Sequence, residues 1–213
     1  MTLRTGVGPR LGPPVARPEL AVPPHVRVIS LARGDAPEAV VADWIELEPT
    51  LLAHHEALTE LVAGATRHRQ PGDVAAFFTY ADLGGGLTGW AAVLTLELVE
   101  AMGGTPAARA RRIVGRLRAA AQQLGHPEGT TQVGSLTTSG RVAAARVRFL
   151  AAATPDEAED CARMVEACRW LYPVPRHGDL VWSLCFQTLD LDHADELVTE
   201  FDAMAASLRW TRP

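Results

Sequence analysis

One segment, residues 179–210, changes its hydrophobic period once, and this change constrains the fold more than any other feature of the sequence. Four bulky apolar residues first alternate with smaller or more polar ones, as in a strand that buries one row of side chains: Leu180, Trp182, Leu184 and Phe186. Beyond residues 188–192 the apolar residues recur at intervals of three and four, as on one face of a helix: Leu191, Ala194, Leu197, Val198, Phe201, Met204, Ala205 and Leu208. The pattern predicts a strand followed by an amphipathic helix that packs on a sheet, with Asp190 or Asp192 as the helix N-cap.

The composition excludes several classes of function. All 20 basic residues are arginine, so a Schiff-base lysine, a phosphate-loop lysine and a protein-kinase lysine are all ruled out. The formal net charge of -5 argues against binding nucleic acid or a membrane surface through the whole chain. No apolar signal-peptide core follows Arg4 and Arg10, and no segment approaches the length of a membrane span. We therefore expect a cytoplasmic protein, and the bias toward Ala, Gly, Pro and Arg indicates a GC-rich, bacterial genome.

The chain divides into a short N-terminal arm and one domain. Residues 1–24 are rich in Pro, Gly and Arg and have no apolar period, so we expect an extended arm that is ordered only where it packs on something. Residues 25–213 are expected to form a single α+β domain. Residues 35–69 predict a helical insert in this domain, with Pro37 near its first turn and Pro49 at a break or restart.

The rest of the domain predicts an antiparallel meander of strands and one more helix. Strands are expected at residues 26–31, 74–81, 89–99, 131–138, 141–150 and 165–174. The DLGGGLTG segment supplies glycines for a hairpin between the second and third of these strands. A helix is expected over residues 105–124. Residues 154–172 also carry helix start signals, but the alternation of Cys168, Trp170 and Tyr172 favours a strand there.

The strand over residues 141–150 has a marked alternation of its own. Small or apolar residues are expected to face the core: Ala143, Ala145, Val147 and Phe149. Arg146 and Arg148 fall between them, and we expect these two side chains to point outward.

The order of hairpin, helix, antiparallel strands and closing helix over residues 73–210 resembles the PsbP-like α/β/α sandwich. Three segments carry the resemblance: the helix over residues 105–125, the hairpin GSLTTSGRVAAARVRFL, and the strand and helix LVWSLCFQTLDLDHADELVTEFDAMAASLRW. The insert over residues 35–69 departs from this pattern. The resemblance implies an antiparallel sheet packed against helices, and a binding or scaffold role in place of an enzymatic one, without indicating a ligand.

Candidate metal and catalytic sites are weak in this sequence. The segment DLDHAD has the oxygen and nitrogen donors of a metal site, but it lacks the EF-hand pattern and is better interpreted as a helix start. Cys161, Cys168 and Cys185 have no zinc-type spacing, so we interpret them as buried thiols in preference to a scattered zinc or thiol site formed with His177. His55 does not begin an HExxH motif. No GxSxG elbow is present either, so we assign no catalytic residue, metal or cofactor.

A helix rich in arginine is the sequence feature most suggestive of function. Its arginines cover most of the helix outside the apolar stripe: Arg109, Arg111, Arg112, Arg116 and Arg118. Such a face is either a solvated exterior or a surface for an acidic partner, because guanidinium groups make forked contacts with carboxylates. Together with aromatic residues of large apolar area, it defines the candidate interaction surface: Arg109, Arg112, Arg116, Trp90, Trp170 and Tyr172.

Two functions remain open from the sequence. The first is a non-enzymatic binding or accessory protein that acts by contact with a protein partner or with a second copy of itself. The alternative is a small-molecule-binding protein or an enzyme, with a pocket between the sheet and the C-terminal helix lined by Trp182, Trp170 and Tyr172.

Overall fold

The computed structural model describes residues 15–79, 89–123, 131–152 and 164–211. Within these residues, one antiparallel sheet contains seven strands in the order β2-β3-β4-β8-β7-β6-β5, and two short strands pair with each other. The sheet comprises β2 (Arg27–Ser30), β3 (Asp73–Phe78), β4 (Ala91–Leu98), β5 (Thr131–Thr137), β6 (Ala143–Ala152), β7 (Met164–Pro173) and β8 (Leu180–Thr188). The short pair is β1 (Arg17–Glu19) and β9 (Arg209–Thr211). The helices are α1 (Pro37–Leu47), η1 (Pro49–His54, a 3-10 helix), α2 (His55–Arg67), α3 (Pro106–Gln123) and α4 (Ala194–Ala206).

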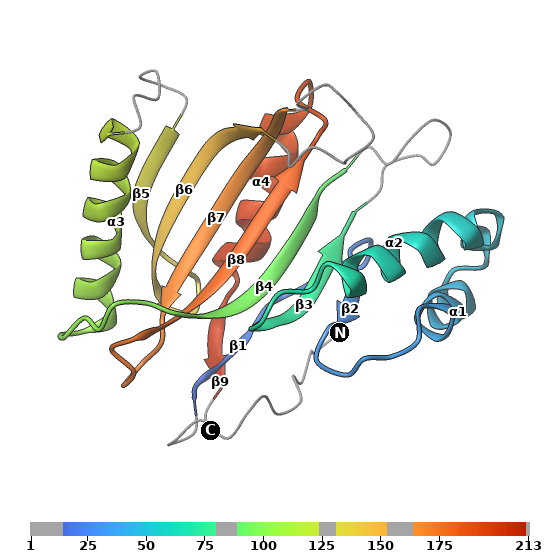
Figure 1. Cartoon of the computed structure of the whole chain (residues 1–213), viewed down its shortest axis with the longest axis horizontal. Helices are drawn as coiled ribbons and strands as arrows, with labels where there is room; N and C mark the ends of the chain where they lie inside the picture. Colours follow the sequence, from blue (N-terminus) through green and yellow to red (C-terminus); the bar gives the residue numbers. More distant parts are fainter. Residues whose placement is uncertain (1–14, 80–88, 124–130, 153–163, 212–213) are drawn as a thin grey trace.

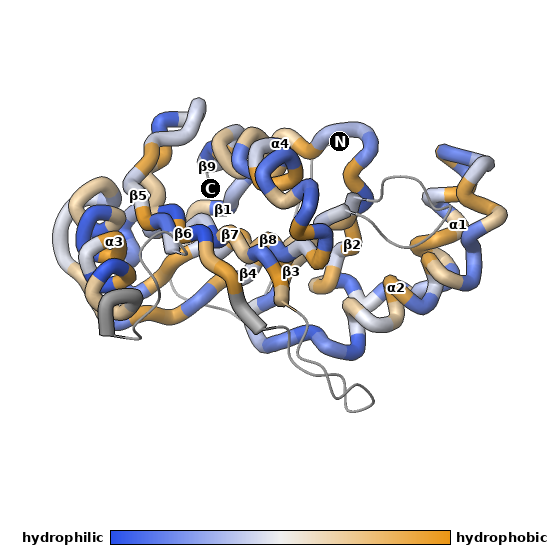
Figure 2. The backbone as a smooth tube through the Cα atoms, turned by 90° about the horizontal axis from the view of Figure 1, so that it is seen from above, coloured by the Kyte–Doolittle hydropathy of each residue, from blue (hydrophilic) through white to orange (hydrophobic). Residues whose placement is uncertain are grey.

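The helices cover both faces of the sheet, as Figures 1 and 2 show. Helix α4 and the β1-β9 pair lie on one face. Helix α3 lies on the other face near β5, while α1 and α2 lie on that same face at the opposite end, near β2 and β3. Successive side chains of β3 pack on opposite faces of the sheet, since Phe77 packs on the α4 side and Ala76 packs under α2. The predicted α+β architecture with a large antiparallel sheet is therefore confirmed.

The segment with the change of period forms the centre of this architecture. The alternating residues of β8 are buried against the apolar stripe of α4, which includes Val198, Phe201 and Met204. The prediction of the N-cap is wrong, because His193 occupies that position without a capping side-chain bond. The Asp190 carboxylate instead accepts a hydrogen bond from the His193 backbone N–H at 3.2 Å. The helix ends at Ala206, and the chain continues into β9.

The second half of the expected arm is part of the fold. Strand β1 pairs with β9 in antiparallel register, which joins the two ends of the described chain. Leu20 enters the α4-side core with only 8% of its surface exposed. The indole N–H of Trp182 donates to the Ala16 carbonyl at 3.2 Å, and the Ala21 N–H donates to Ser207 Oγ at 2.9 Å. Residues 1–14 lie outside the described residues.

Residues 35–69, expected to form a helical insert, contain α1, η1 and α2. Helix α1 ends before Pro49, η1 follows it, and α2 ends at Arg67. Its apolar residues pack on β2 and β3 in a separate core cluster that contains Val41, Trp44, Leu51, Leu58, Val62, Ile29, Ala76 and Phe78. The N-cap of α1 is Ala36, with no side-chain capping bond, and Pro37 is in the first turn.

The remaining strands were predicted correctly, with β7 as a strand along its whole described length. Strands β3 and β4 pair as expected for a hairpin, and residues 80–88 of their connection lie outside the described residues. Leu124, at the end of the expected helix, and Cys161 also lie outside the described residues. The prediction that Arg146 and Arg148 point outward is wrong. Both side chains pair with acidic residues of α4 and are largely buried beneath this helix. None of the helices described is both long and apolar enough to cross a membrane.

Candidate interaction surface

Helix α3 begins at a threonine and a proline and is anchored by one apolar stripe. Thr105 Oγ1 accepts a hydrogen bond from the Ala108 N–H at 3.2 Å, which satisfies one of the free donors of the first turn. Ile113 and Val114 then pack on Ala145, Leu171 and Val181 of the sheet. This packing fixes which face of the helix the arginines can occupy.

Arg109 belongs to the interior and not to the surface. It is 2% exposed and donates to two main-chain carbonyls of the loop between β7 and β8, those of Val174 and His177. Burial, reinforced by neighbouring Arg112, lowers its pKa from the ordinary value. The expectation that Arg109 contacts a partner does not hold in the folded chain, because its guanidinium joins α3 to this loop.

The other arginines of α3 lie outside and keep part of their donor capacity. Arg112 is exposed and donates to the Gly103 carbonyl, and exposed Arg116 pairs with Glu100 at 2.9 Å. Arg118 donates to the Val133 carbonyl of β5 at 3.0 Å. Arg111 is exposed as well. A guanidinium has several N–H donors, so each of these residues can still bind a carboxylate.

The three aromatic residues of the candidate surface lie in the core. Trp90 is packed between Phe186 and Phe201, with ring centroids 5.8 and 5.9 Å away. Trp170 stacks on Tyr172 with centroids 6.0 Å apart, and the Tyr172 hydroxyl donates to the Ala205 carbonyl at 2.9 Å. These side chains join α4 to the sheet and cannot contact a partner in the folded chain. With Trp182 they also fill the space where the alternative function placed a pocket.

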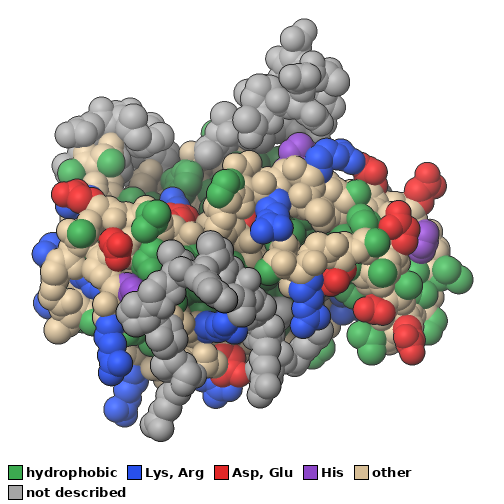
Figure 3. Space-filling view, turned by 60° about the horizontal axis from the view of Figure 1, so that its bottom comes forward, with side chains coloured by type: hydrophobic (Ala, Val, Ile, Leu, Met, Phe, Trp, Pro, Cys, Tyr) green, Lys and Arg blue, Asp and Glu red, His purple; other side chains and the backbone are tan. Residues whose placement is uncertain are grey.

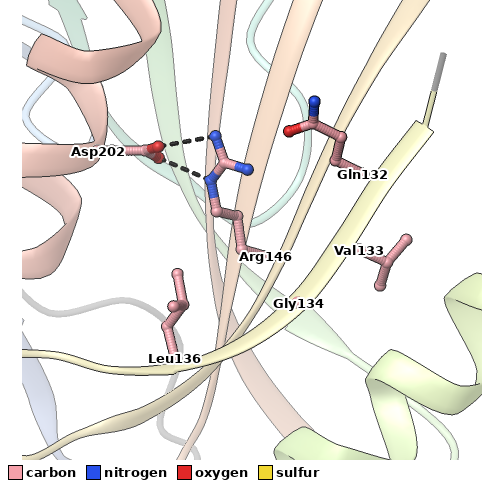
Figure 4. A pocket seen from close by; sticks show the side chains of 6 residues that line it. All are labelled: Gln132, Val133, Gly134, Leu136, Arg146 and Asp202. Atoms are coloured by element: carbon pink, nitrogen blue, oxygen red, sulfur yellow. Dashed lines mark hydrogen bonds and ion pairs between the residues drawn. The ribbon is translucent and has the colours of Figure 1, made fainter. Parts of the chain in front are cut away.

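A hollow beside α4 contains polar groups that the sequence reading missed. It has a volume of about 400 Å³ and is lined by Gln132, Val133, Gly134, Leu136, Arg146 and Asp202. Arg146 binds Asp202 through Nε at 3.0 Å and Nη2 at 2.7 Å, and Figure 4 shows its third nitrogen pointing away from Asp202 toward Gln132. Burial is the largest single influence and lowers the pKa of Arg146, but the hydrogen bond to Asp202 and the nearby negative charge together outweigh it, so the pKa is raised. The charge of this pair is therefore internally balanced, and an N–H donor remains for a neutral acceptor.

A second hollow of about 240 Å³ lies between α2 and the sheet. Its lining is mainly apolar, with Leu31, Leu61, Phe78 and Val93 among the contributing residues. His68 and Asp73 also line it, but neither makes a bond with the other.

Other polar sites in the described chain are structural ion pairs. Arg169 bridges strands by donating to Ser183 Oγ at 2.8 Å and to the Glu97 carboxylate. Arg148 pairs with Glu166 at 2.8 Å and also with Asp195. Among the described residues, no cluster of three or more His, Cys, Asp or Glu side chains could hold a metal ion. Asp190 and His193 of the DLDHAD segment bind each other at 3.0 Å at the start of α4.

The comparisons with known proteins give a distant structural likeness. No family model matches the chain, and neither does any curated protein. Among solved structures, the chain is similar to the solution structure of cyanobacterial PsbP (CyanoP) from Synechocystis sp. PCC 6803, with 11% identity and a TM-score of 0.41. The likeness covers 97% of this chain and 98% of that one. The resemblance expected from the sequence is confirmed at this distant level, and the likeness carries no argument about function.

Proposed function

We propose that this chain is a non-enzymatic binding protein that contacts an acidic surface of a partner protein in the cytoplasm through the outer face of α3. We define this surface as the α3 arginine face: Arg111, Arg112, Arg116 and Arg118. The observation that carries the proposal is the sequence of α3, which has these exposed arginines and no acidic residue along its whole length.

The first turn of α3 lacks the negative charge that usually stabilises the start of a helix. The N-terminal end of a helix carries a partial positive charge, so acidic residues stabilise the first turn and basic residues do not. Helices α1 and α4 follow this rule with Glu38 and with Asp195 and Glu196, whereas the first turn of α3 has no acidic residue. The helix dipole and the arginines together give this end of the molecule a positive potential, which favours an anionic partner.

The opposite end of the molecule has the reverse net charge. Residues 33–69, which include α1, η1 and α2, contain seven acidic residues and three arginines. Figure 3 shows acidic side chains gathered at this end. Because the two charged ends are separated by the width of the sheet, the partner is expected to bind in one orientation. A second copy that presents its acidic end is one such partner, and sedimentation at low and high salt detects this form of binding.

A reversal of charge on α3 tests the proposal. We expect Arg112→Glu with Arg116→Glu to abolish capture of the partner from an extract of the source organism, since both changes replace attraction by repulsion. The matched control is Arg67→Glu with Arg69→Glu, which reverses two exposed arginines at the other end of the molecule. Capture is quantified by mass spectrometry. If the double variant on α3 retains every protein that the control retains, the α3 arginine face is only a solvated exterior.

A further inference from the structure

Strand β5 is an edge strand whose own sequence lacks the usual protection against pairing, although α3 lies beside it and Arg118 donates to the Val133 carbonyl. Among the described residues it forms one end of the sheet and pairs only with β6, over seven residues in continuous register. Its sequence, TQVGSLT, contains no charged residue and no proline, and it has no β-bulge. Natural sheets commonly block free edges with such features. The opposite edge strand, β2, has four residues and includes Arg27, so the two edges differ in their capacity to accept another strand.

The surroundings of β5 supply side-chain contacts on both sides. On the α4 side, the hollow of about 400 Å³ places Arg146 and Gln132 along the strand. On the other side lies α3, and Arg118 already donates to the main-chain oxygen of Val133 at 3.0 Å. An additional strand at this edge would therefore have guanidinium groups near each of its two faces.

We propose that β5 receives an extended acidic segment of the partner protein, which displaces the Arg118 bond to the Val133 carbonyl, pairs with this edge and extends the sheet. This proposal rests on the proposed function and specifies how the partner binds. Side chains of a strand alternate between two faces, so every second residue of the segment would face α3, on the flank where Arg118 contacts β5. These residues are acidic. The intervening residues face Arg146, whose charge Asp202 already neutralises, and they carry neutral acceptors such as hydroxyl or amide groups.

A second copy of the chain fits this edge less well than an acidic segment does. Pairing of β5 with another β5 would bring two α3 helices together at the junction, because α3 lies beside β5 in each copy. Each helix would contribute arginines and no acidic residue, so the two helices would repel each other. The positive charge beside the edge selects an occupant of opposite charge.

The test uses the full-length chain and three synthetic nine-residue peptides that differ in one respect each. The first alternates Glu with Thr or Val, the second has Lys in place of Glu, and the third keeps Glu but has its three central amides N-methylated. N-methylation removes main-chain donors without changing the charge. We expect the first peptide to bind and to slow amide hydrogen exchange in residues 131–137. The other two are expected to bind at least about tenfold more weakly, because each lacks one of the two contributions.

The possible outcomes separate the two proposals. If the N-methylated peptide binds as tightly as its parent while the Lys peptide does not, strand addition is wrong and the acidic partner of α3 stands. Equal binding of the Lys peptide and the Glu peptide overturns the proposed function. Protection of residues 131–137 that rises with protein concentration in the absence of peptide shows that a second copy occupies the edge, and this also overturns strand addition by an acidic segment.

Discussion

Trp170 on β7 donates its indole N–H to the Asp202 carboxylate on α4 at 2.7 Å, deep beneath the helix. The same carboxylate accepts two hydrogen bonds from Arg146 on β6 and one at 3.6 Å from the Cys168 thiol. One acidic residue of α4 is therefore bonded to two neighbouring strands. This arrangement fixes the position of the helix along the sheet as well as its distance from it.

We expect Asp202→Asn to lower the free energy of unfolding by about 2 kcal/mol, between the values typical of exposed and buried ion pairs. The Arg146 side chain is 15% exposed and would lose its compensating charge. Urea denaturation measures this change. The matched control is Glu60→Gln, which removes an exposed pair with Arg67 at 3.4 Å and should cost no more than about 0.5 kcal/mol. Equal small losses in both variants would show that the Asp202 contacts add little stability.

The cysteine beside Asp202 predicts a loss of stability in alkaline solution. Burial, assisted by the negative charge of Asp202, raises the pKa of the Cys168 thiol far above its ordinary value. Above about pH 8.5 the unfolded chain loses this proton while the folded chain retains it, so the free energy of unfolding falls as pH rises. One such thiol contributes a slope of up to about 1.4 kcal/mol per pH unit.

Urea denaturation between pH 8 and pH 10 measures this slope. Cys168→Ala should reduce the slope without removing it, because burial also raises the pKa of Cys185. The comparison uses slopes and not absolute stabilities, since the smaller alanine side chain lowers stability at every pH. An unchanged slope in Cys168→Ala would contradict the prediction.

The Asp190–His193 pair predicts a shifted histidine titration. The hydrogen bond to Asp190 is the main cause that raises the pKa of His193, and the same bond lowers the pKa of Asp190. Stability from the raised histidine pKa is present below about pH 6.5 and is lost as pH rises through the folded-state pKa. Stability from the lowered aspartate pKa is present above about pH 3.9 and is lost as pH falls through its folded-state pKa. The Asp190–His193 pair therefore stabilises the fold most between about pH 3.9 and about pH 6.5.

Titration by NMR should give His193 a midpoint above the usual value for histidine. Asp190→Asn is expected to move this midpoint down. The matched control is Glu196→Gln, which removes a smaller contribution and should move the midpoint less. A midpoint that is the same in wild type and Asp190→Asn would show that the hydrogen bond does not form in solution.

The fold was predictable where hydrophobic period and glycine or proline signals agreed. Residues 179–210 contain a change of period, and Pro49 interrupts the helical insert at the break that the structure shows. The orientation of Arg146 and Arg148 was not predictable from the same alternation. The sheet is covered on both faces, so both rows of a strand are inward, and a polar row can be buried when a helix supplies acidic partners.

The candidate surface combined exposed with buried residues for a related reason. Period alone separates the apolar stripe of α3 from its arginines, but it cannot show that Arg109 lies under a loop from a distant part of the chain. The sequence does not show that the strands of Trp90, Trp170 and Tyr172 pack against α4, so it does not show that these aromatic side chains are buried. The strand over residues 131–138 was predicted, but its place at the edge was not, since whether a strand lies at an edge depends on the order of the sheet and not on its own sequence.

Replacement of glycine by alanine is expected to change the free energy of unfolding in opposite directions at two positions. A Cβ atom on Gly140, in the turn between β5 and β6, would lie 2.6 Å from the Leu208 carbonyl oxygen and 2.7 Å from Arg209 Cβ. The turn therefore packs directly on the chain after α4, where the Ser139 N–H also donates to the Ala206 carbonyl at 2.8 Å. We expect Gly140→Ala to lower the free energy of unfolding by about 1–3 kcal/mol, because backbone must move to admit the methyl group.

Gly115 is the matched control, since a Cβ there meets no atom within 4 Å. It lies on the exposed side of α3, where alanine is a better helix former than glycine. Gly115→Ala should therefore raise the free energy of unfolding by about 0.5–1 kcal/mol. Chemical denaturation of the two single variants measures both changes. A loss of stability in Gly115→Ala would contradict the open outer face of α3, on which the proposed binding of an acidic partner depends.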